Sequence, residues 1–208
     1  PPRMTLSRSS GFTLIELMVT VAIVSILLIV AVPSFQTVMN SNRLTTAANE
    51  FVAAFQAARA EAIRYNRRVV ICLSTNPNAA TPTCAPADAT NATGWIVFMD
   101  ANTNGTYSTT DCDAVNTSIC DRLLRAAAPA AGVRILGSSN LAGKVRIDFR
   151  ADGLARRSTG TVLSGTVRMC LPTGRPAENI RNVNIRGGGV VVTRADGNKA
   201  CAEPGNAL

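Results

Sequence analysis

The chain has 208 residues, no histidine and a formal net charge of +8. Without histidine it lacks the commonest general base and the commonest metal ligand, which argues against a hydrolytic triad or a zinc site and favours a protein that is not an enzyme and needs no cofactor. Its length and its hydrophobic content of 47% allow one membrane helix and one soluble domain with its own core.

A nearly continuous apolar run extends from Phe12 to Val32, with Glu16 as its one charged residue. Because the run is longer than the roughly 18 residues that span a bilayer, it predicts a membrane helix. A carboxylate at mid-bilayer costs about 2.5–3.5 kcal/mol and is normally there for a function, with a partner that neutralises it. The short basic segment that ends in Gly11 is typical of a processing signal, but one in which cleavage would precede the hydrophobic run.

The start of this run resembles the type IV pilin signature through Gly11-Phe12-Thr13-Leu14-Ile15-Glu16, the apolar segment and Pro33. The resemblance implies that a prepilin peptidase cuts after Gly11 and methylates the new amino-terminal Phe12. It also implies that the helix stays in the inner membrane until it packs into a filament, where Glu16 meets the Phe12 amine of a neighbouring subunit. The alternative is an ordinary signal anchor with a stray glutamate.

These features divide the chain into a leader (1–11), a hydrophobic transmembrane and assembly helix (12–39) and a periplasmic head (40–208). The head is expected to combine the amphipathic second half of the helix (40–66) with a β-rich domain (67–208). Pro33 predicts a kink or a locally melted segment, because proline removes a backbone donor and clashes with the preceding turn. Beyond it, apolar residues recur at three- and four-residue spacing and predict one buried helix face: Leu44, Ala47, Ala48, Phe51, Ala54, Phe55, Ala58, Ala62 and Ile63.

Strand signals follow the helix. Short β-branched or apolar runs separated by turn residues predict about eight strands, at 68–73, 95–99, from 122, 133–136, 145–149, 167–171, 183–185 and 190–193. One long helix followed only by strands argues for an α+β fold, in which an antiparallel β-rich head packs on the amphipathic half of the helix.

All of the cysteines lie beyond the membrane segment, and they are even in number: Cys72, Cys84, Cys112, Cys120, Cys170 and Cys201. Because no pair has the C-x-x-C spacing of a zinc or redox site, we expect a disulfide framework formed in an oxidising compartment, which in a bacterium is the periplasm. Six cysteines allow 15 pairings. Pairing of nearest neighbours is the simplest expectation, because each bond would close a polar loop.

The head is similar in sequence to the GspH/FimT family of minor pilins and pseudopilins. The similarity rests on Gly94-Trp95-Ile96-Val97-Phe98-Met99-Asp100, Asn102, Asn104-Gly105, Leu123-Leu124-Arg125, Phe149 and Asp152-Gly153. It implies a long helix that carries a β-rich head without catalytic activity.

The segment after the second expected strand has the spacing of a calcium loop, with Asp100, Asn102, Asn104 and, at the twelfth place, Asp111. A strand precedes this segment and Cys112 follows it, where the calcium motif has helices and a bidentate glutamate. A turn rich in Asn, Asp and Gly also forms without an ion. We therefore expect a plain turn and keep calcium as the weaker alternative.

Arginines are frequent in the C-terminal third, and Arg181, Arg186 and Arg194 are the candidates for DNA contacts. DNA-uptake members of the FimT group carry a Gly-Arg-x-Arg motif, whereas the matching place here is Gly189-Val190-Val191-Val192. Phosphate binding needs charge more than exact order, so the flanking arginines could substitute. Aromatic residues that could stack on bases are scarce. DNA binding is therefore an alternative that the sequence does not favour.

The sequence as a whole favours a minor type IV pilin that helps to initiate or cap pilus assembly. Its expected partners are other minor pilins, the major pilin and the prepilin peptidase. The expected location is the inner membrane, as a single-pass protein with a periplasmic head, and then the extracellular pilus. Two alternatives remain: a GspH-type pseudopilin of a type II secretion system, and a FimT-like DNA-binding minor pilin for natural transformation.

Overall fold

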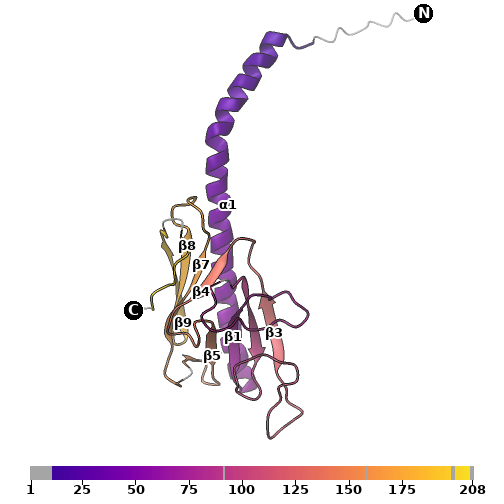
Figure 1. The fold of residues 1–208 in the computed structure, drawn as a ribbon, viewed down its shortest axis with the longest axis vertical. Coiled ribbons are helices and arrows are strands. Elements are labelled where there is room, and N and C mark those ends of the chain that lie inside the picture. Colours follow the sequence, from indigo (N-terminus) through magenta and orange to yellow (C-terminus); the bar gives the residue numbers. More distant parts are fainter. Residues whose placement is uncertain (1–10, 91, 158, 198–199, 207–208) are drawn as a thin grey trace, which may run out of the picture.

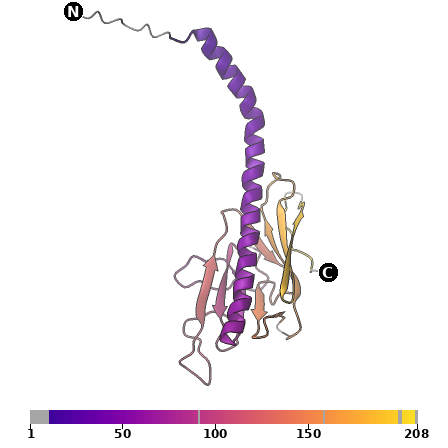
Figure 2. The ribbon, with the colours of Figure 1, turned by 180° about the vertical axis from the view of Figure 1, so that it is seen from behind.

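The structure is a computed structural model and describes residues 11–90, 92–157, 159–197 and 200–206. A single helix, α1 (Leu14–Tyr65), runs the length of the molecule, and its C-terminal half lies against a β-rich head (Figures 1 and 2). The side chain of Thr13 caps the first turn by accepting a hydrogen bond from the Glu16 backbone N–H. The helix ends at Tyr65 and is capped by Asn66, whose left-handed φ of 51° is a conformation that asparagine tolerates.

The head contains two sheets in the described part of the chain, and each neighbouring pair of strands is antiparallel. The first has the order β3-β2-β1-β5-β6 and the second β4-β7-β8-β9. The strands are β1 (Val69–Ser74), β2 (Gly94–Met99), β3 (Arg122–Ala127), β4 (Arg134–Gly137), β5 (Arg146–Phe149), β6 (Ala155–Arg156), β7 (Ser164–Cys170), β8 (Ile180–Arg186) and β9 (Gly189–Ala195).

The fold class expected from the sequence is confirmed, with three corrections of detail. The strands form two sheets. The strand β6 was not predicted, because a two-residue segment is too short to show an alternation of apolar and polar residues. The helix also continues through Pro33 instead of melting there, and its exposed half curves gently (Figure 1). Gentle curvature is common in long helices and is less than the sharp kink or break that an internal proline can cause.

The core lies where the second half of α1 meets both sheets. The Phe51 ring packs edge-on against Trp95 of β2, with centroids 5.2 Å apart, and Phe55 packs in the same way against Phe149 of β5 at 4.8 Å. Of the predicted buried face, every residue is buried except Ile63, whose side chain is 52% exposed. Ile63 touches the turn at Gly153, but it lies in the last turns of the helix, where one side stays open to solvent.

Three disulfides tie loops to this framework, and they join nearest neighbours as expected: Cys72–Cys84, Cys112–Cys120 and Cys170–Cys201. The first holds the long loop between β1 and β2 against β1. The second closes the loop before β3, and the third fastens the C-terminal segment to the end of β7. The described residues contain no free cysteine.

The two halves of α1 should differ sharply in their sensitivity to substitution. Phe55→Ala should lower the free energy of unfolding by about 3–5 kcal/mol, because it leaves a cavity against Phe149. Phe35 lies on the same helix but is 67% exposed. The matched change Phe35→Ala should therefore leave the free energy of unfolding of the head unchanged. Urea denaturation of the detergent-solubilised chain, followed by the fluorescence of Trp95, measures both. Equal losses would contradict the assigned core.

Candidate functional site

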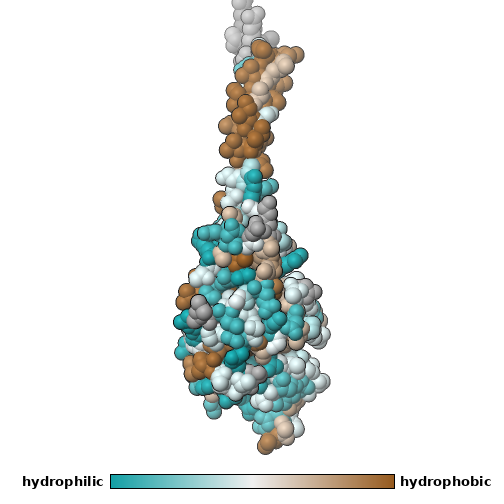
Figure 3. Space-filling model, turned by 60° about the vertical axis from the view of Figure 1, so that its left-hand side comes forward, coloured by the Kyte–Doolittle hydropathy of each residue, from teal (hydrophilic) through white to brown (hydrophobic). Residues whose placement is uncertain are grey.

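The most unusual surface of the molecule is the N-terminal half of α1, which projects beyond the head with its apolar side chains uncovered (Figure 3). Within the described residues it is the one helix long and apolar enough to cross a membrane, and none of the apolar window is buried. Each fully buried Leu, Ile, Val or Phe side chain contributes about 1.5–3 kcal/mol. The surface therefore has to be covered by lipid or by other apolar helices, because the head does not reach it.

The expected processing site lies at the free end of this segment. Gly11, Phe12 and Thr13 precede the helix, and a side-chain carbon placed on Gly11 would meet no atom within 4 Å. Phe12 is 82% exposed. Within the described residues, no packing covers the Gly11–Phe12 peptide bond.

Glu16 follows in the first helical turn, where its charge is favoured by the positive end of the helix dipole. Its backbone N–H bonds the Thr13 hydroxyl oxygen at 3.3 Å, whereas its carboxylate has no hydrogen bond or ion pair with any described residue. The carboxylate is therefore available to a group from another molecule. Pro33, the other predicted assembly residue, lies further along the same helix and is partly exposed.

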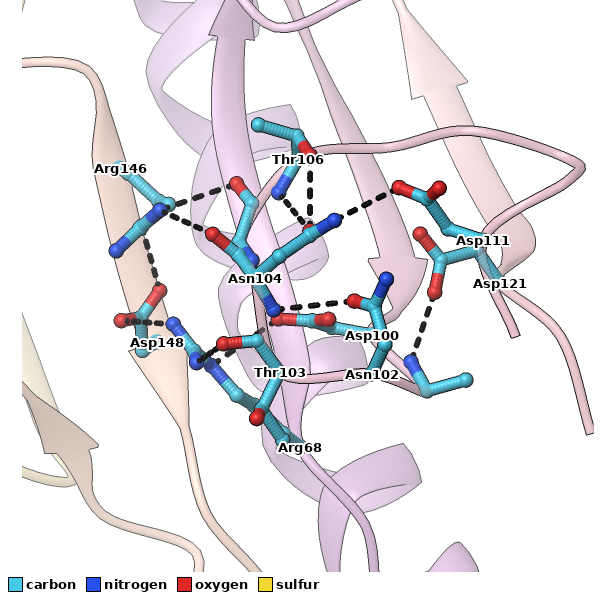
Figure 4. Close-up of polar contacts among 12 residues, drawn as sticks. Arg68, Asp100, Asn102, Thr103, Asn104, Thr106, Asp111, Asp121, Arg146 and Asp148 are labelled. Atoms are coloured by element: carbon cyan, nitrogen blue, oxygen red, sulfur yellow. Dashed lines mark hydrogen bonds and ion pairs between the residues drawn. The ribbon is translucent and has the colours of Figure 1, made fainter. Parts of the chain in front are cut away.

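In the head, Arg68 is the centre of a buried charge network at the end of α1 (Figure 4). Its guanidinium lies 2.6 Å from Asp148 and 3.3 Å from Asp100, and it donates to the Thr103 carbonyl at 2.7 Å. Arg146 completes the network by pairing with Asp148 at 3.0 Å. The Arg68–Asp148–Arg146 group was not predicted from the sequence, because Arg68 precedes β1, its partners lie on β5, and the pairing of these two strands is not visible in the chain. The one available signal is Asp148, a carboxylate between the buried Ile147 and Phe149 of β5.

The segment with calcium-loop spacing forms a turn rich in Asn and Asp, the reading that the sequence favoured over a calcium site. Asp100 faces Arg68 and accepts from the Gly105 N–H at 2.9 Å, and Asp111 accepts from the Asn104 amide at 2.7 Å. Asn102 and Asn104 accept from backbone N–H groups two residues further on, as in an ordinary Asx turn. In the described part of the chain, no group of three or more Asp, Glu, Cys or His side chains is close enough to hold a metal ion. The hydrogen bonds above thus occupy most of the loop's side-chain oxygens with protein donors, whereas Asp100 Oδ1 is buried without a hydrogen-bond partner among the described residues.

Burial raises the pKa of Asp100, and the facing Arg68 opposes that rise. Burial also raises the pKa of Asp121, which holds the start of the same loop by accepting from the Ala101 N–H at 2.8 Å. The loop is thus fixed by two buried carboxylates, and their hydrogen bonds and one cation offset the cost of desolvating them.

Arg181, one of the three candidates for DNA contacts, is not available at the surface. It is 2% exposed, and its guanidinium donates to the hydroxyls of Ser41 and Thr45 on α1, at 3.1 and 3.4 Å. It also donates to the carbonyls of Glu178 and Ile180, at 2.9 and 3.0 Å. Arg181 therefore clamps β8 to α1, and its assignment to a DNA surface was wrong because alternation along β8 points this residue inward.

The other two candidates, Arg186 and Arg194, are exposed, but they lie on different parts of the surface. The Arg194 side chain is 62% exposed and lies 3.9 Å from Glu178. Arg186 is exposed at the end of β8 and lines an open groove of about 680 Å³ on the outer face of the second sheet. Arg168, Asn182, Val191 and Pro204 are among the other residues of this groove. The three arginines thus form no common basic surface.

A continuous helix with an uncovered apolar N-terminal half, a carboxylate in its first turn and a disulfide-tied β-rich head define a protein of the type IV pilin class. The sequence profile of the family described as type II transport protein GspH matches residues 47–189, and the prokaryotic N-terminal methylation motif matches residues 6–32. The chain belongs to the GspH family.

Among solved structures, the chain is similar to the type IV minor pilin FimU of Pseudomonas aeruginosa strain PAO1. The identity is 20%, the TM-score is 0.45, and the match covers 74% of this chain and 90% of that one. The search of curated proteins gave no match.

The clamp role of Arg181 can be tested by comparing two substitutions. Arg181→Met should lower the free energy of unfolding by about 1–3 kcal/mol, because it removes a buried guanidinium that donates to the Glu178 and Ile180 carbonyls and to two hydroxyls of α1. Arg194→Met removes an exposed arginine from the neighbouring strand and should change stability by about 0.5 kcal/mol or less. Urea denaturation compares the two variants. Similar values would show that Arg181 is not a clamp.

A second prediction concerns the loop closed by Cys112–Cys120. Arg67 bonds Asp113 at 2.9 Å and holds the pKa of that carboxyl at about 2, below its usual 3.8. Because the folded pKa is lowered, the pair stabilises the fold above pH 3.8, and this contribution is lost as the pH falls towards 2. In Arg67→Gln the Asp113 pKa should rise towards its usual value, as measured by NMR titration. A pKa that stays near 2 would assign the shift to the backbone bonds from Val115 and Asn116 instead.

Proposed function

We propose that this chain is a minor type IV pilin, a structural subunit that helps to initiate or cap pilus assembly and has no enzymatic role. The observation that supports this most strongly is the uncovered apolar half of α1, joined without a break to a head that packs on the other half. One rigid helix that is anchored at one end and carries a domain at the other suits a subunit that moves from a bilayer into a filament.

In this mechanism the leader (1–11) is removed by a prepilin peptidase and Phe12 becomes the methylated amino terminus. The helix (12–39) then leaves the inner membrane and packs against the helices of other minor pilins and the major pilin. In that dry environment the Glu16 carboxylate pairs with the positive Phe12 amine of a neighbour, which offsets the cost of burying either charge alone. The periplasmic head (40–208) becomes part of the extracellular pilus.

A pseudopilin of a type II secretion filament is the second candidate, and the family profile described as a type II transport protein favours it. The helix would be used in the same way in both filaments. The two candidates differ in the machine that incorporates the chain. Its presence in sheared surface pili, and its absence from a secretion filament, would separate them.

DNA binding remains an alternative that we do not favour. Arg181 is buried, and Arg186 and Arg194 lie on opposite faces of the β8–β9 hairpin, so the residues suggested by the sequence cannot grip one phosphate backbone together.

Processing is tested at Gly11. The wild-type chain extracted from membranes should have the intact mass of a protein that starts at N-methylated Phe12, whereas Gly11→Val should retain the leader. The control Thr20→Val also introduces a valine, but further along the helix, and this variant should be processed normally. Cleavage of the wild type after the apolar run would make the segment an ordinary signal peptide.

The role of Glu16 is tested with Glu16→Gln, which removes the charge and keeps the volume. Membrane insertion should be unchanged or improved, because a charge in the bilayer is costly. Incorporation into sheared filaments should fall by about tenfold or more, as for the loss of a buried ion pair. Glu16→Asp, which keeps the charge, should retain more incorporation than Glu16→Gln. Equal incorporation of wild type and Glu16→Gln would remove the proposed role of the charge.

A further inference from the structure

The strand β9 ends the second sheet, and none of the described residues forms a strand on its outer side. It lies at the edge of the head, away from the first sheet (Figures 1 and 2). A free sheet edge carries a row of unpaired backbone donors and acceptors, which is a template for another strand.

The register shows which backbone groups point outward. Arg186 and Gly189 flank the two-residue turn at Gly187 and Gly188, where Gly187 has a φ of 60°. In such a hairpin the flanking pair exchanges both of its hydrogen bonds, and bonded pairs then alternate along the ladder. The N–H and C=O groups of Val190, Val192 and Arg194 therefore point away from β8. No hydrogen bond joins these outward groups to any described residue.

The side chains of β9 are also uncovered, because α1 packs on β7 and β8 and β9 extends beyond it. Val183 is fully buried, yet Val192 directly opposite it is 40% exposed. On the other face Val191 is 64% exposed. An incoming strand would therefore gain apolar contacts on both faces as well as backbone hydrogen bonds.

The other edges of the two sheets are poorer templates. β6 has two residues and β4 has four. β3 is longer, but it carries Arg122 and Arg125 and has a register shift where it pairs with β2. Charges, short length and irregularity are the usual means of protecting an edge. β9 has seven residues in continuous register and no such protection apart from Arg194.

We propose that β9 takes an extended, apolar and acidic strand of a different filament subunit, by β-strand addition. Arg186 and Arg194, one at each end of the valine run, select carboxylates at the two ends of the incoming strand. This inference rests on the proposed function, since it assumes assembly with other subunits.

A second copy of this chain is a poor occupant for two reasons. Antiparallel pairing of β9 with the β9 of a copy would point the two α1 helices in opposite directions, whereas helices that leave one membrane must be parallel. Pairing of β9 with the β3 of a copy would bring Arg186 and Arg194 close to Arg122 and Arg125, and like charges on adjacent strands are destabilising.

The test uses the full chain in detergent, co-purified with the other minor pilins of its own assembly system produced in defined amounts. Hydrogen exchange resolved to single residues should show fast exchange at Val190, Val192 and Arg194 in the isolated chain. In the complex these three amides should slow by at least tenfold, while the amides of Val191 and Thr193, already bonded to β8, change little.

Two variants then test the contact itself. Val192→Pro removes one outward N–H at an edge position where proline is tolerated, and it should weaken the complex by at least tenfold, whereas Val192→Thr keeps that N–H and should bind like the wild type. Arg194→Glu reverses an exposed charge without touching the backbone. This variant should also weaken binding by about tenfold. It therefore still tests the contact if Val192→Pro fails to fold.

Each result has a distinct meaning. A complex that forms while the three amides stay fast, or that tolerates both Val192→Pro and Arg194→Glu, overturns the inference and leaves the proposed function standing. Tighter binding by Arg194→Glu also overturns it, because the partner strand would then be basic. If the wild type joins no other subunit and pairs only with itself, both the inference and the proposed function fail.

Discussion

Helix α1 carries apolar side chains along almost its whole length, and the head is large enough to cover only the stretch from Leu44 to Ala62. In that stretch Phe51 and Phe55 pack edge-on against aromatic rings of the first sheet, and the small alanines between them let both sheets approach the helix closely. The remaining apolar half has no partner in the molecule. Folding of the head thus fixes the direction of a surface that only lipid or other subunits can cover.

The polar interactions of the head strengthen this arrangement at both ends of the covered stretch. Arg181 joins α1 to β8 near the start of the covered stretch, and Arg68 joins the end of the helix to Asp100 and Asp148 in the first sheet. Both guanidiniums are largely desolvated and several carbonyl, hydroxyl or carboxylate oxygens surround them, which is the condition under which a buried charge is tolerated. The head is therefore held rigidly on the helix, as a subunit that transmits the position of its anchor requires.

Much of this fold could be predicted from the sequence, because the signals were local or periodic. The helix, its buried face and most of the strands follow from the spacing of apolar residues, and the disulfides join cysteines that are neighbours in the chain. Features that depend on which strands pair could not be predicted. The partner of Asp100 is one such feature, because Arg68 comes from the segment before β1. Arg181 is a different case, since it alternates with the buried Val183 and Ile185 of β8 and this local signal was overlooked. The free edge of β9 is equally invisible in the chain, since it depends on the order of strands in a sheet.

We infer that the uncovered half of α1 becomes buried among the helices of other subunits. It is tested most directly by placing a photo-crosslinking amino acid at Val24, in the middle of the exposed apolar segment, and irradiating membranes and sheared filaments separately. The same residue placed at Val115, which is 96% exposed on the head, serves as the control. We expect Val24 to link to the N-terminal helices of other pilin subunits in filaments and to lipid in membranes, while Val115 should do neither. Lipid links alone in both fractions, with the chain missing from filaments, would contradict it.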